Sequence, residues 1–382
     1  MIRVAIDART LVQKTRSGIG NYIRDIIPHI VELADDIQFT IIRNPKGQIP
    51  GTTQKNVQEI LIPYDTMSLY TVFRPGLGAS LSNFELYHSP YSMIPPGLRC
   101  PVVVTVHDMM WIEAPKLAAR FPLWRWPRHL WYAATFGYAI RKSSAIIAIS
   151  KATADAIRRI FPEQAQNVHV IHHGIDLERF SPERAKERSA LDPWIPRGIK
   201  YSMAVGKGSP YKNHANIVRA FVRATHDQPD HKLVLIRRSA RIDFEMWKLR
   251  LNPDVKNKVI LLPFVDDDKL RTFYRHAQML LFLSRYEGFG MPVFEAMAMG
   301  IPVLASSIPA LMEISGDAAL HAESGDLSDM AEKIRSLATD KVLRDKLIAA
   351  GRKHVHQYTW SRCAGEILKV YRKTISKDLG HG

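Results

Sequence analysis

Short apolar and β-branched runs alternate with longer amphipathic stretches along the first half of the chain. Helical patterns include residues 21–34 and 151–161, and strand-like runs occupy residues 2–7, 39–44, 57–63, 84–89, 101–108, 144–150 and 168–174. Strands that are interleaved with helices indicate parallel βαβ units whose two sheet faces are both covered. The first half therefore predicts a doubly wound α/β domain.

This pattern stops after Asp176 and then begins again. Residues 178–198 are polar, charged and proline-containing, so we expect a linker there. A second series of strand-like runs follows at residues 201–206, 231–238, 258–264, 277–284, 302–306 and 319–323. We predict a first Rossmann-like domain of residues 1–180, a second of residues 198–364, and a final helix, at about residues 365–382, that crosses back to the first domain. Ligands bind at the carboxyl ends of strands in such sheets, so the expected site is a central cleft between the domains.

Length and composition agree with this organisation and narrow the function. The 382 residues exceed one compact core, and the 46% of hydrophobic residues excludes a disordered chain. The net charge of +16 predicts an anionic partner, namely nucleic acid, a membrane surface or a phosphorylated small molecule. Two cysteines exclude a disulfide framework and a four-cysteine zinc site. Neither a bilayer-spanning apolar run nor a signal-peptide pattern is visible, so we expect a cytoplasmic protein.

The segment most informative about chemistry is SRYEGFGMPVFEAMAMGIPVLAS, residues 284–306. Pro292 suits the first turn of a helix, so the helix should begin near Met291, with Glu287 in the preceding loop and Glu295 one turn inside. The loop amides between the two glutamates and the positive helix end form an anion site that suits phosphate. The two flanking carboxylates can bind sugar hydroxyls.

The E-x7-E spacing of Glu287 and Glu295 resembles the retaining glycosyltransferases of family 4, which have the GT-B fold. In that family the second glutamate binds the ribose hydroxyls of the nucleotide, and the first lies near the donor sugar. The intervening amides meet the diphosphate and the sugar. The resemblance assigns these roles to Glu295, to Glu287, and to Phe289 with Gly290, and it places Met291 on the donor-binding side.

A second match to the family is VGKGSPYKN, residues 205–213. The family shows Gly-Arg, four residues and then Lys-Asn; here Lys207 stands at the arginine position, and Lys212 and Asn213 stand as expected. Asn213 suits the N-cap of a following helix, and two cations near one diphosphate stabilise a departing nucleoside diphosphate. Since lysine lacks the bidentate guanidinium, Arg237 is a candidate to share this role. Without the family context, two such lysines are more typical of surface charge.

Two features of the predicted first domain also resemble the family. Gly18 and Gly20 lie in the expected loop after the first strand, where glycine lets the backbone approach the donor phosphates or the acceptor. His107 follows a strand, at a position where family members often carry a histidine that faces the reacting sugar. His107 is therefore our candidate active-site residue of this domain, and the alternative is a buried, hydrogen-bonded histidine at a strand end.

The stretch between Glu113 and Asp155 contains no acidic residue and is rich in basic residues and tryptophan, among them Arg120, Trp124, Arg125, Trp126 and Arg128. This composition suits the headgroup region of an anionic membrane. We expect the stretch to bind the inner face of the cell membrane and to bring the site to a lipid-linked acceptor. In the alternative interpretation the aromatic side chains pack into the core, because Pro122 and Pro127 interrupt a clean helical face.

Together the resemblance implies a retaining glycosyltransferase that uses a nucleotide sugar and needs neither a metal nor another cofactor. The implied acceptor is an oligosaccharide on a polyprenyl diphosphate carrier in bacterial surface polysaccharide synthesis. Mannose from GDP-mannose is the first donor candidate, and a UDP-sugar is the alternative. A basic nucleic-acid-binding protein is a further alternative, but no helix-turn-helix, zinc or RNA-binding signature is present, so we expect no nucleic acid partner. A dinucleotide-dependent enzyme lacks its G-x-G-x-x-G fingerprint after the first strand.

Overall fold

The computed structural model describes residues 2–11, 18–49, 54–74, 77–81, 83–118, 125–237 and 244–379. The chain divides into two compact units, each with its own parallel sheet. Unit 1 comprises residues 1–113, 126–174 and 358–382, and unit 2 comprises residues 114–125 and 175–357. Within the described ranges, no helix is long and apolar enough to cross a membrane.

Unit 1 is built on a seven-stranded parallel sheet in the order β3-β2-β1-β4-β5-β6-β7. Every residue of the central strands β5 and β6 is buried, because helices cover both faces of the sheet. Each strand overlaps a run predicted above. The strands are β1 (Ile2–Asp7), β2 (Ile37–Arg43), β3 (Val57–Leu61), β4 (Leu86–Ser89), β5 (Val102–Val106), β6 (Ala145–Ala148) and β7 (Val168–Val170).

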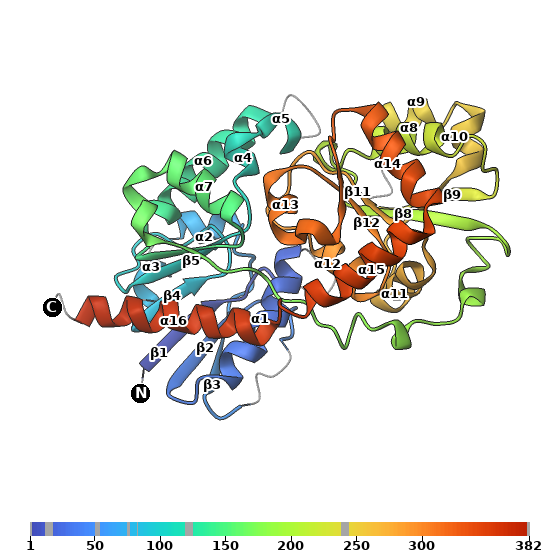
Figure 1. The fold of residues 1–382 in the computed structure, drawn as a ribbon. Helices are drawn as coiled ribbons and strands as arrows, with labels where there is room; N and C mark the ends of the chain where they lie inside the picture. Colours follow the sequence, from blue (N-terminus) through green and yellow to red (C-terminus); the bar gives the residue numbers. More distant parts are fainter. Residues whose placement is uncertain are drawn as a thin grey trace. The chain divides into compact units, whose positions relative to one another are not determined.

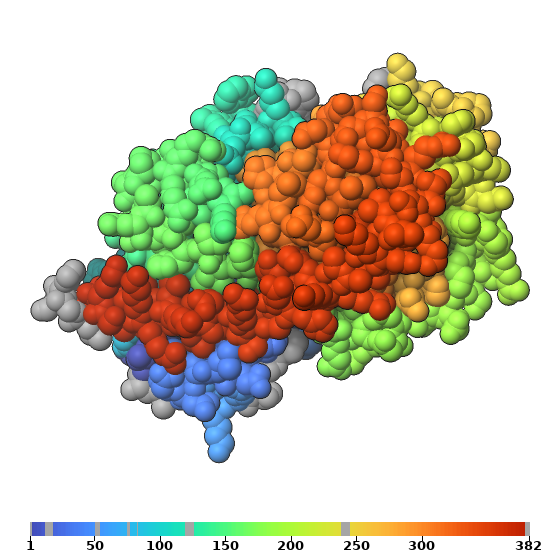
Figure 2. All heavy atoms as spheres, in the orientation of Figure 1, coloured from blue at the N-terminus to red at the C-terminus, as the bar shows by residue number. Residues whose placement is uncertain are grey.

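The helices of unit 1 include the last helix of the chain, which returns to this unit as expected and packs on α1, but begins at Trp360 rather than near residue 365 (Figure 1). The Tyr371 hydroxyl of this helix lies 2.5 Å from Nδ1 of the buried His88 in β4 and ties it to the sheet. Its outer face stays exposed along the surface (Figure 2). The helices are α1 (Gly18–Glu32), α2 (Leu69–Phe73), α3 (Leu77–Ser80), α4 (Met110–Glu113), α6 (Arg125–Lys142), α7 (Lys151–Ile160) and α16 (Trp360–Leu379).

Unit 2 has a six-stranded parallel sheet in the order β10-β9-β8-β11-β12-β13. Its strands are β8 (Lys200–Gly206), β9 (His231–Arg237), β10 (Val259–Leu262), β11 (Leu280–Phe282), β12 (Val303–Ser306) and β13 (Leu320–Ala322). Its helices are α5 (Pro115–Ala118), α8 (His214–Ala224), α9 (Phe244–Leu249), α10 (Pro253–Lys258), α11 (Asp267–His276), α12 (Met291–Ala298), α13 (Pro309–Ser315), α14 (Leu327–Thr339) and α15 (Lys341–Val355).

The segment expected as a linker, residues 178–198, is folded against unit 2. It contains two short 3₁₀ turns, Pro182–Arg184 and Arg188–Leu191, that pack on α11. The Lys186 amide donates to the Thr272 hydroxyl at 3.2 Å. A polar, proline-containing segment is therefore ordered here, because its backbone groups form hydrogen bonds with a neighbouring helix.

The strand order reverses once in each sheet. In unit 1 the chain runs outward from β1 to β3 and returns to β4 on the other side of β1; in unit 2 it runs from β8 to β10 and returns to β11 beside β8. Loops that leave neighbouring strands in opposite directions open a crevice at their carboxyl ends, where open α/β sheets bind ligands. The candidate ligand-binding positions are thus the carboxyl ends of β1 and β4 in unit 1, and those of β8 and β11 in unit 2.

Candidate active site

Two loops that carry predicted donor-binding residues meet at the reversal point of the unit 2 sheet. Lys212 lies in the loop after β8, and Glu287 lies in the loop after β11. Lys212 Nζ donates to Glu287 Oε1 at 2.6 Å, and the two side chains are 11% and 12% exposed. The same ammonium lies 4.5 Å from the centre of the Phe282 ring, within cation–π distance. The structure therefore joins the leading residues of both sequence motifs in one nearly buried ion pair.

Asn213 holds these two loops together. Its Nδ2 donates to the Leu283 carbonyl at 3.0 Å and to the Ser324 carbonyl at 2.7 Å. Asn213 occupies the N-cap position of α8, as predicted, but its backbone is left-handed (φ 58°) and its side chain makes no capping bond. The expected cap is thus correct in position and wrong in mechanism, because the amide satisfies buried carbonyls across the sheet instead.

The loop after β8 is shaped by two glycines and an arginine. A Cβ on Gly206 would lie 3.1 Å from Lys212 Cδ, so this glycine makes room for the lysine stem. Gly208 has φ 67°, and the buried Arg237 donates from Nη2 to the Gly208 carbonyl at 3.2 Å. Arg237 therefore supports the loop from the end of β9, while Lys207 on that loop is exposed.

The segment predicted to bind phosphate begins a helix where the sequence predicts it. α12 starts at Met291, with Pro292 in its first turn. Gly290 precedes it at φ 123°, a conformation that strains any residue with a Cβ, and a Cβ there would also lie 2.6 Å from Leu311 Cδ2, so glycine is strongly favoured. Phe289 is buried edge-on against Phe294, with ring centres 5.2 Å apart. This packing fixes the loop amides that precede the positive end of α12.

Glu295 lies one turn inside α12, as expected, and a residue that the sequence did not reveal orients it. The Tyr274 hydroxyl of α11 donates to Glu295 Oε2 at 2.9 Å. Burial and the neighbouring Glu295 carboxylate raise the pKa of Tyr274 well above its usual range, so the phenol stays protonated and keeps donating. The only sequence signal for Tyr274 is its place on the apolar face of α11.

In unit 1, His107 directly follows β5, and its Nε2 lies 2.9 Å from the Pro90 carbonyl oxygen. Burial lowers its pKa to about 4, so the ring is neutral near pH 7. Because a carbonyl only accepts, Nε2 carries the proton, and Nδ1 keeps the lone pair. The rings of Tyr22 and His173 lie 5.0 and 5.5 Å away. His107 is thus a fixed, neutral imidazole at a strand end.

Gly18 and Gly20 do not lie in a loop, which corrects the prediction for this segment. Both belong to the first turn of α1, and neither has a positive φ. Gly18 is exposed, and a Cβ there would have no atom within 4 Å, whereas Gly20 is buried. The first turn of a helix leaves its amides without intrahelical acceptors and tolerates glycine. The backbone at these two positions does not require the conformational freedom of glycine.

Comparison with known proteins decides the family. Residues 16–179 match the family described as Glycosyltransferase Family 4, and residues 193–354 match Glycosyl transferases group 1. The chain is a family 4 glycosyltransferase. O-antigen chain mannosyltransferase B of Escherichia coli is 23% identical over 75% of this chain and 74% of that protein.

Two solved structures show that this glycosyltransferase has the GT-B fold. Sucrose-phosphate synthase from Thermosynechococcus elongatus superposes with a TM-score of 0.75 at 18% identity, over 99% of this chain and 100% of that chain. Anabaena Alr3699/HepE, solved in complex with UDP and glucose, gives a TM-score of 0.70 at 17% identity, over 97% and 99%. The predicted family and the predicted pair of Rossmann-like sheets are confirmed.

The tryptophan-rich stretch of the glycosyltransferase divides between core and surface. Arg120 and Trp124 lie outside the described residues, and Arg125 is the first residue of α6. Trp126 and Arg128 are exposed on α6. Pro127 falls in the first turn of α6, where it does not interrupt the helix. Trp131 and Tyr132 of the stretch are partly buried: Trp131 packs beside Phe136, and Tyr132 stacks on Trp111, which precedes the stretch, with ring centres 4.7 Å apart.

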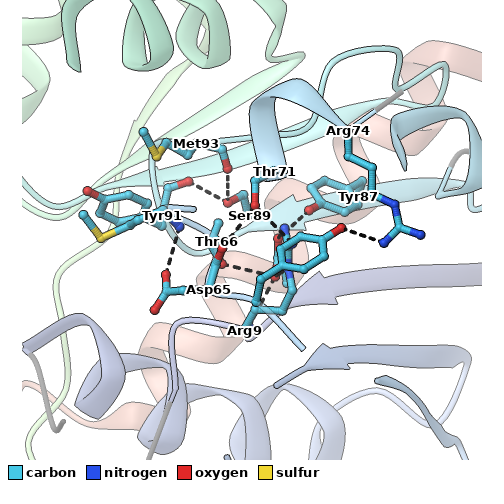
Figure 3. Close-up of polar contacts among 12 residues, drawn as sticks. Arg9, Asp65, Thr66, Thr71, Arg74, Tyr87, Ser89, Tyr91 and Met93 are labelled. Atoms are coloured by element: carbon cyan, nitrogen blue, oxygen red, sulfur yellow. Dashed lines mark hydrogen bonds and ion pairs between the residues drawn. The ribbon is translucent and has the colours of Figure 1, made fainter. Parts of the chain in front are cut away.

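A buried polar network at the reversal point of unit 1 was not predicted (Figure 3). Arg9 Nη2 donates to Asp7 Oδ2 at 2.6 Å, and both side chains are fully buried. Tyr87 donates to the same oxygen at 2.7 Å, and Arg9 Nη1 donates to the Thr71 hydroxyl at 3.2 Å. Burial would raise the pKa of Asp7, but the charge and hydrogen bonds of Arg9 outweigh it and hold the pKa below its usual range. The pair is therefore ionised.

No group of three or more His, Cys, Asp or Glu side chains is placed to hold a metal ion within the part of the chain that the structure describes. The positive groups brought to the unit 2 site are instead Lys212 and the amino end of α12. Both suit a polyanionic ligand that binds at the ends of β8 and β11.

Proposed function

We propose that this glycosyltransferase moves a sugar, with mannose from GDP-mannose as the first candidate, from a nucleotide diphosphate sugar to an oligosaccharide on a polyprenyl diphosphate carrier. The transfer retains the anomeric configuration and uses no metal. The observation that carries the proposal is the ion pair between Lys212, in the loop that leads to α8, and Glu287, in the loop that leads to α12, with Glu295 held one turn inside α12.

In this proposal the donor diphosphate binds the amides at Phe289, Gly290 and Met291. The helix end and loop amides supply partial positive charge there at no reorganisation cost. Glu295, oriented by Tyr274, accepts hydrogen bonds from the ribose hydroxyls. These contacts leave the sugar beside the loop of the first glutamate.

Lys212, Lys207 and Glu287 act on the reacting end of the donor. The acceptor hydroxyl attacks the anomeric carbon from the face on which the diphosphate departs, and the carbon–oxygen bond to the diphosphate breaks. Lys212, with the exposed Lys207, stabilises the charge on the leaving nucleoside diphosphate, which takes up the acceptor proton. Glu287 positions Lys212 before the donor arrives and then lies near the sugar. Because the pair retains some exposure, Lys212 can exchange part of this contact for phosphate.

Unit 1 is proposed to serve the acceptor and the reacting sugar. His107 offers a neutral imidazole with its Nδ1 lone pair, and Gly18 and Gly20, in the first turn of α1, let the backbone approach the donor phosphates or the acceptor. We also propose that the protein associates peripherally with the inner face of the cell membrane, where a polyprenyl-linked acceptor lies.

The donor assignment has a second candidate. The name of one relative, O-antigen chain mannosyltransferase B, supports both mannose as the transferred sugar and a surface polysaccharide as the acceptor class. A UDP-sugar is supported by the Anabaena structure, which was solved with UDP and glucose. The residues that bind the diphosphate and the ribose are the same for both donors, so they do not discriminate between the bases.

The test begins with thermal denaturation in the presence of GDP-mannose, UDP-glucose or ADP-glucose. A bound donor raises the melting temperature in proportion to the logarithm of its concentration over its Kd. We expect one nucleotide to do so and then to be released as the diphosphate on addition of an acceptor, with or without a chelator. Proton NMR of the product gives the anomeric configuration. Absence of any nucleotide-dependent stabilisation and of any release would refute the proposal.

A further inference from the structure

Two helices of unit 1 expose large apolar side chains. Leu69, Tyr70 and Phe73 of the short helix α2 are between 61% and 68% exposed, and Trp126 and Leu130 of α6 are 65% and 63% exposed. A single exposed apolar side chain is ordinary, but five of this size on two helices are unusual for a monomeric surface. Burying each of them on a partner is favourable.

These side chains belong to one surface. The ring centre of Phe73 lies 6.0 Å from that of Trp131, so α2 and α6 are neighbours. On α6 the exposed residues Trp126 and Leu130 lie one turn apart on one helix face, and the exposed Tyr138 lies about a third of a turn around the helix from Trp126. We call the set the α2–α6 surface; it comprises Met67, Leu69, Tyr70, Phe73, Trp126, Leu130 and Tyr138.

The buried network of unit 1 holds the α2 part of this surface in place. The one buried side chain of α2 is Thr71, whose hydroxyl accepts from Arg9 and donates to the Asp65 carbonyl at 3.1 Å. Thr66, in the preceding loop, donates to Asp7 at 3.4 Å (Figure 3). The buried contacts of α2 are thus made by charged and hydroxyl groups, while Tyr70 and Phe73 contact the rings of Tyr64 and Trp131 near the surface. The apolar side chains of the helix consequently remain available to a partner.

The charges around the α2–α6 surface identify the partner. α6 contains no acidic residue, and its basic residues are Arg125, Arg128, Arg141 and Lys142. Arg128 lies over the Trp111 ring at 6.0 Å, and Arg74 follows α2 directly. Acidic side chains come only from outside α6: Asp65 accepts from the Met67 amide, and Glu163 pairs with Arg141. An apolar face with tryptophan and tyrosine whose own helix carries basic but no acidic side chains is complementary to the headgroup and upper acyl region of an anionic bilayer.

We propose that the α2–α6 surface is the membrane-docking surface of this protein and that its occupant is an anionic lipid bilayer. The proposal rests on the proposed function insofar as a lipid-linked acceptor requires the protein at a membrane. It extends the sequence prediction, which concerned the stretch between Glu113 and Asp155, to the α2 segment about forty residues earlier in the chain.

The test is sedimentation of the full chain with vesicles of phosphatidylcholine and phosphatidylglycerol, and with vesicles of phosphatidylcholine alone. The wild type should sediment with the anionic vesicles, and less so at high salt. The double variant Tyr70→Ser/Phe73→Ser should lose at least about tenfold in partition, because burying a side chain of this size is worth more than the 1.4 kcal/mol that corresponds to tenfold. Arg128→Gln should weaken binding to the anionic vesicles only.

A matched control is Leu251→Ser/Val342→Ser, which removes two exposed apolar side chains from unit 2 and should leave partition unchanged. Equal partition of the wild type and the Tyr70→Ser/Phe73→Ser variant, or failure of the wild type to bind anionic vesicles, overturns the proposal. A concentration-dependent dimer of the wild type that these substitutions abolish also overturns it, because the surface then belongs to a second copy. Vesicle binding needs no donor, and nucleotide-dependent melting needs no vesicle, so the two proposals fail separately.

Discussion

Replacing Lys212 with methionine tests how much the ion pair at the unit 2 site contributes to the free energy of unfolding. Methionine keeps most of the lysine stem and its contact with the Phe282 ring, but it leaves the Glu287 carboxylate without its cation at 12% exposure. Breaking a fully buried pair in this way costs about 3–5 kcal/mol. The remaining exposure lets water reach the carboxylate, so we expect about 2–3 kcal/mol. For a unit of this size the loss corresponds to about 4–12 °C in melting temperature.

A double-mutant cycle separates the pairing from the packing of either side chain. Glu287→Gln removes the orphaned charge, so Lys212→Met/Glu287→Gln should regain most of the stability that Lys212→Met loses. Calorimetry of the four proteins measures the coupling. Additive effects, within about 0.5 kcal/mol, would show that the pair is not an energetic unit and would refute the reasoning. Lys341→Met, in the solvent-exposed pair with Asp345, is the control and should change little.

The same substitution probes the proposed reaction. If Lys212 stabilises the leaving diphosphate, Lys212→Met should lower turnover by at least about tenfold, whereas Lys341→Met should not. The wild type and the Glu287→Gln variant should differ in turnover more than in nucleotide binding, because Glu287 is proposed to lie near the sugar. Turnover is measured as release of nucleoside diphosphate.

Three further outcomes are expected. Gly290→Ala should cost at least about 2 kcal/mol and abolish nucleotide-dependent stabilisation, while Gly316→Ala, also at positive φ but in open space, should keep it. Tyr274→Phe should raise the KM for the donor about tenfold with a smaller change in kcat, because Glu295 loses its charged hydrogen bond; an unchanged KM contradicts this. Burial lowers the pKa of His107 to about 4 in the folded protein. As the pH falls from about 6.5 to 4, the unfolded chain therefore binds a proton at His107 before the folded protein does, and the free energy of unfolding decreases. His107→Gln should make the melting temperature less dependent on pH in this range.

The strand positions were predictable because of how parallel sheets are covered. β5 and β6 are buried on both faces, so they appear in the sequence as unbroken apolar runs that need no alternation to be recognised. α2 gave no such signal. It has five residues and one buried side chain, and its register depends on Arg9, which lies more than sixty positions earlier. A helix held by distant polar groups leaves no periodic pattern in its own sequence.

The residues of the unit 2 site were predictable in type but not in arrangement. Lys212 and Glu287 were both identified, yet their ion pair depends on the left-handed turn at Asn213 and on its bonds to two carbonyls far along the chain. Asparagine before a helix predicts a cap on local grounds alone. The local rule failed because the buried Leu283 carbonyl after β11 and the partly buried Ser324 carbonyl after β13 accept from the Asn213 amide, which therefore makes no capping bond.

Both sheets place an ion pair at the point where the strand order reverses, and the exposure of each pair separates their proposed roles. Asp7 and Arg9 are fully buried and are also bonded to Tyr87 and Thr71, so neither can turn to a ligand without leaving the other charge unpaired in the core. Lys212 and Glu287 retain water contact, and Lys212 can exchange one anionic partner for another at little desolvation cost. The first pair is therefore suited to fixing a surface helix, and the second to meeting a substrate.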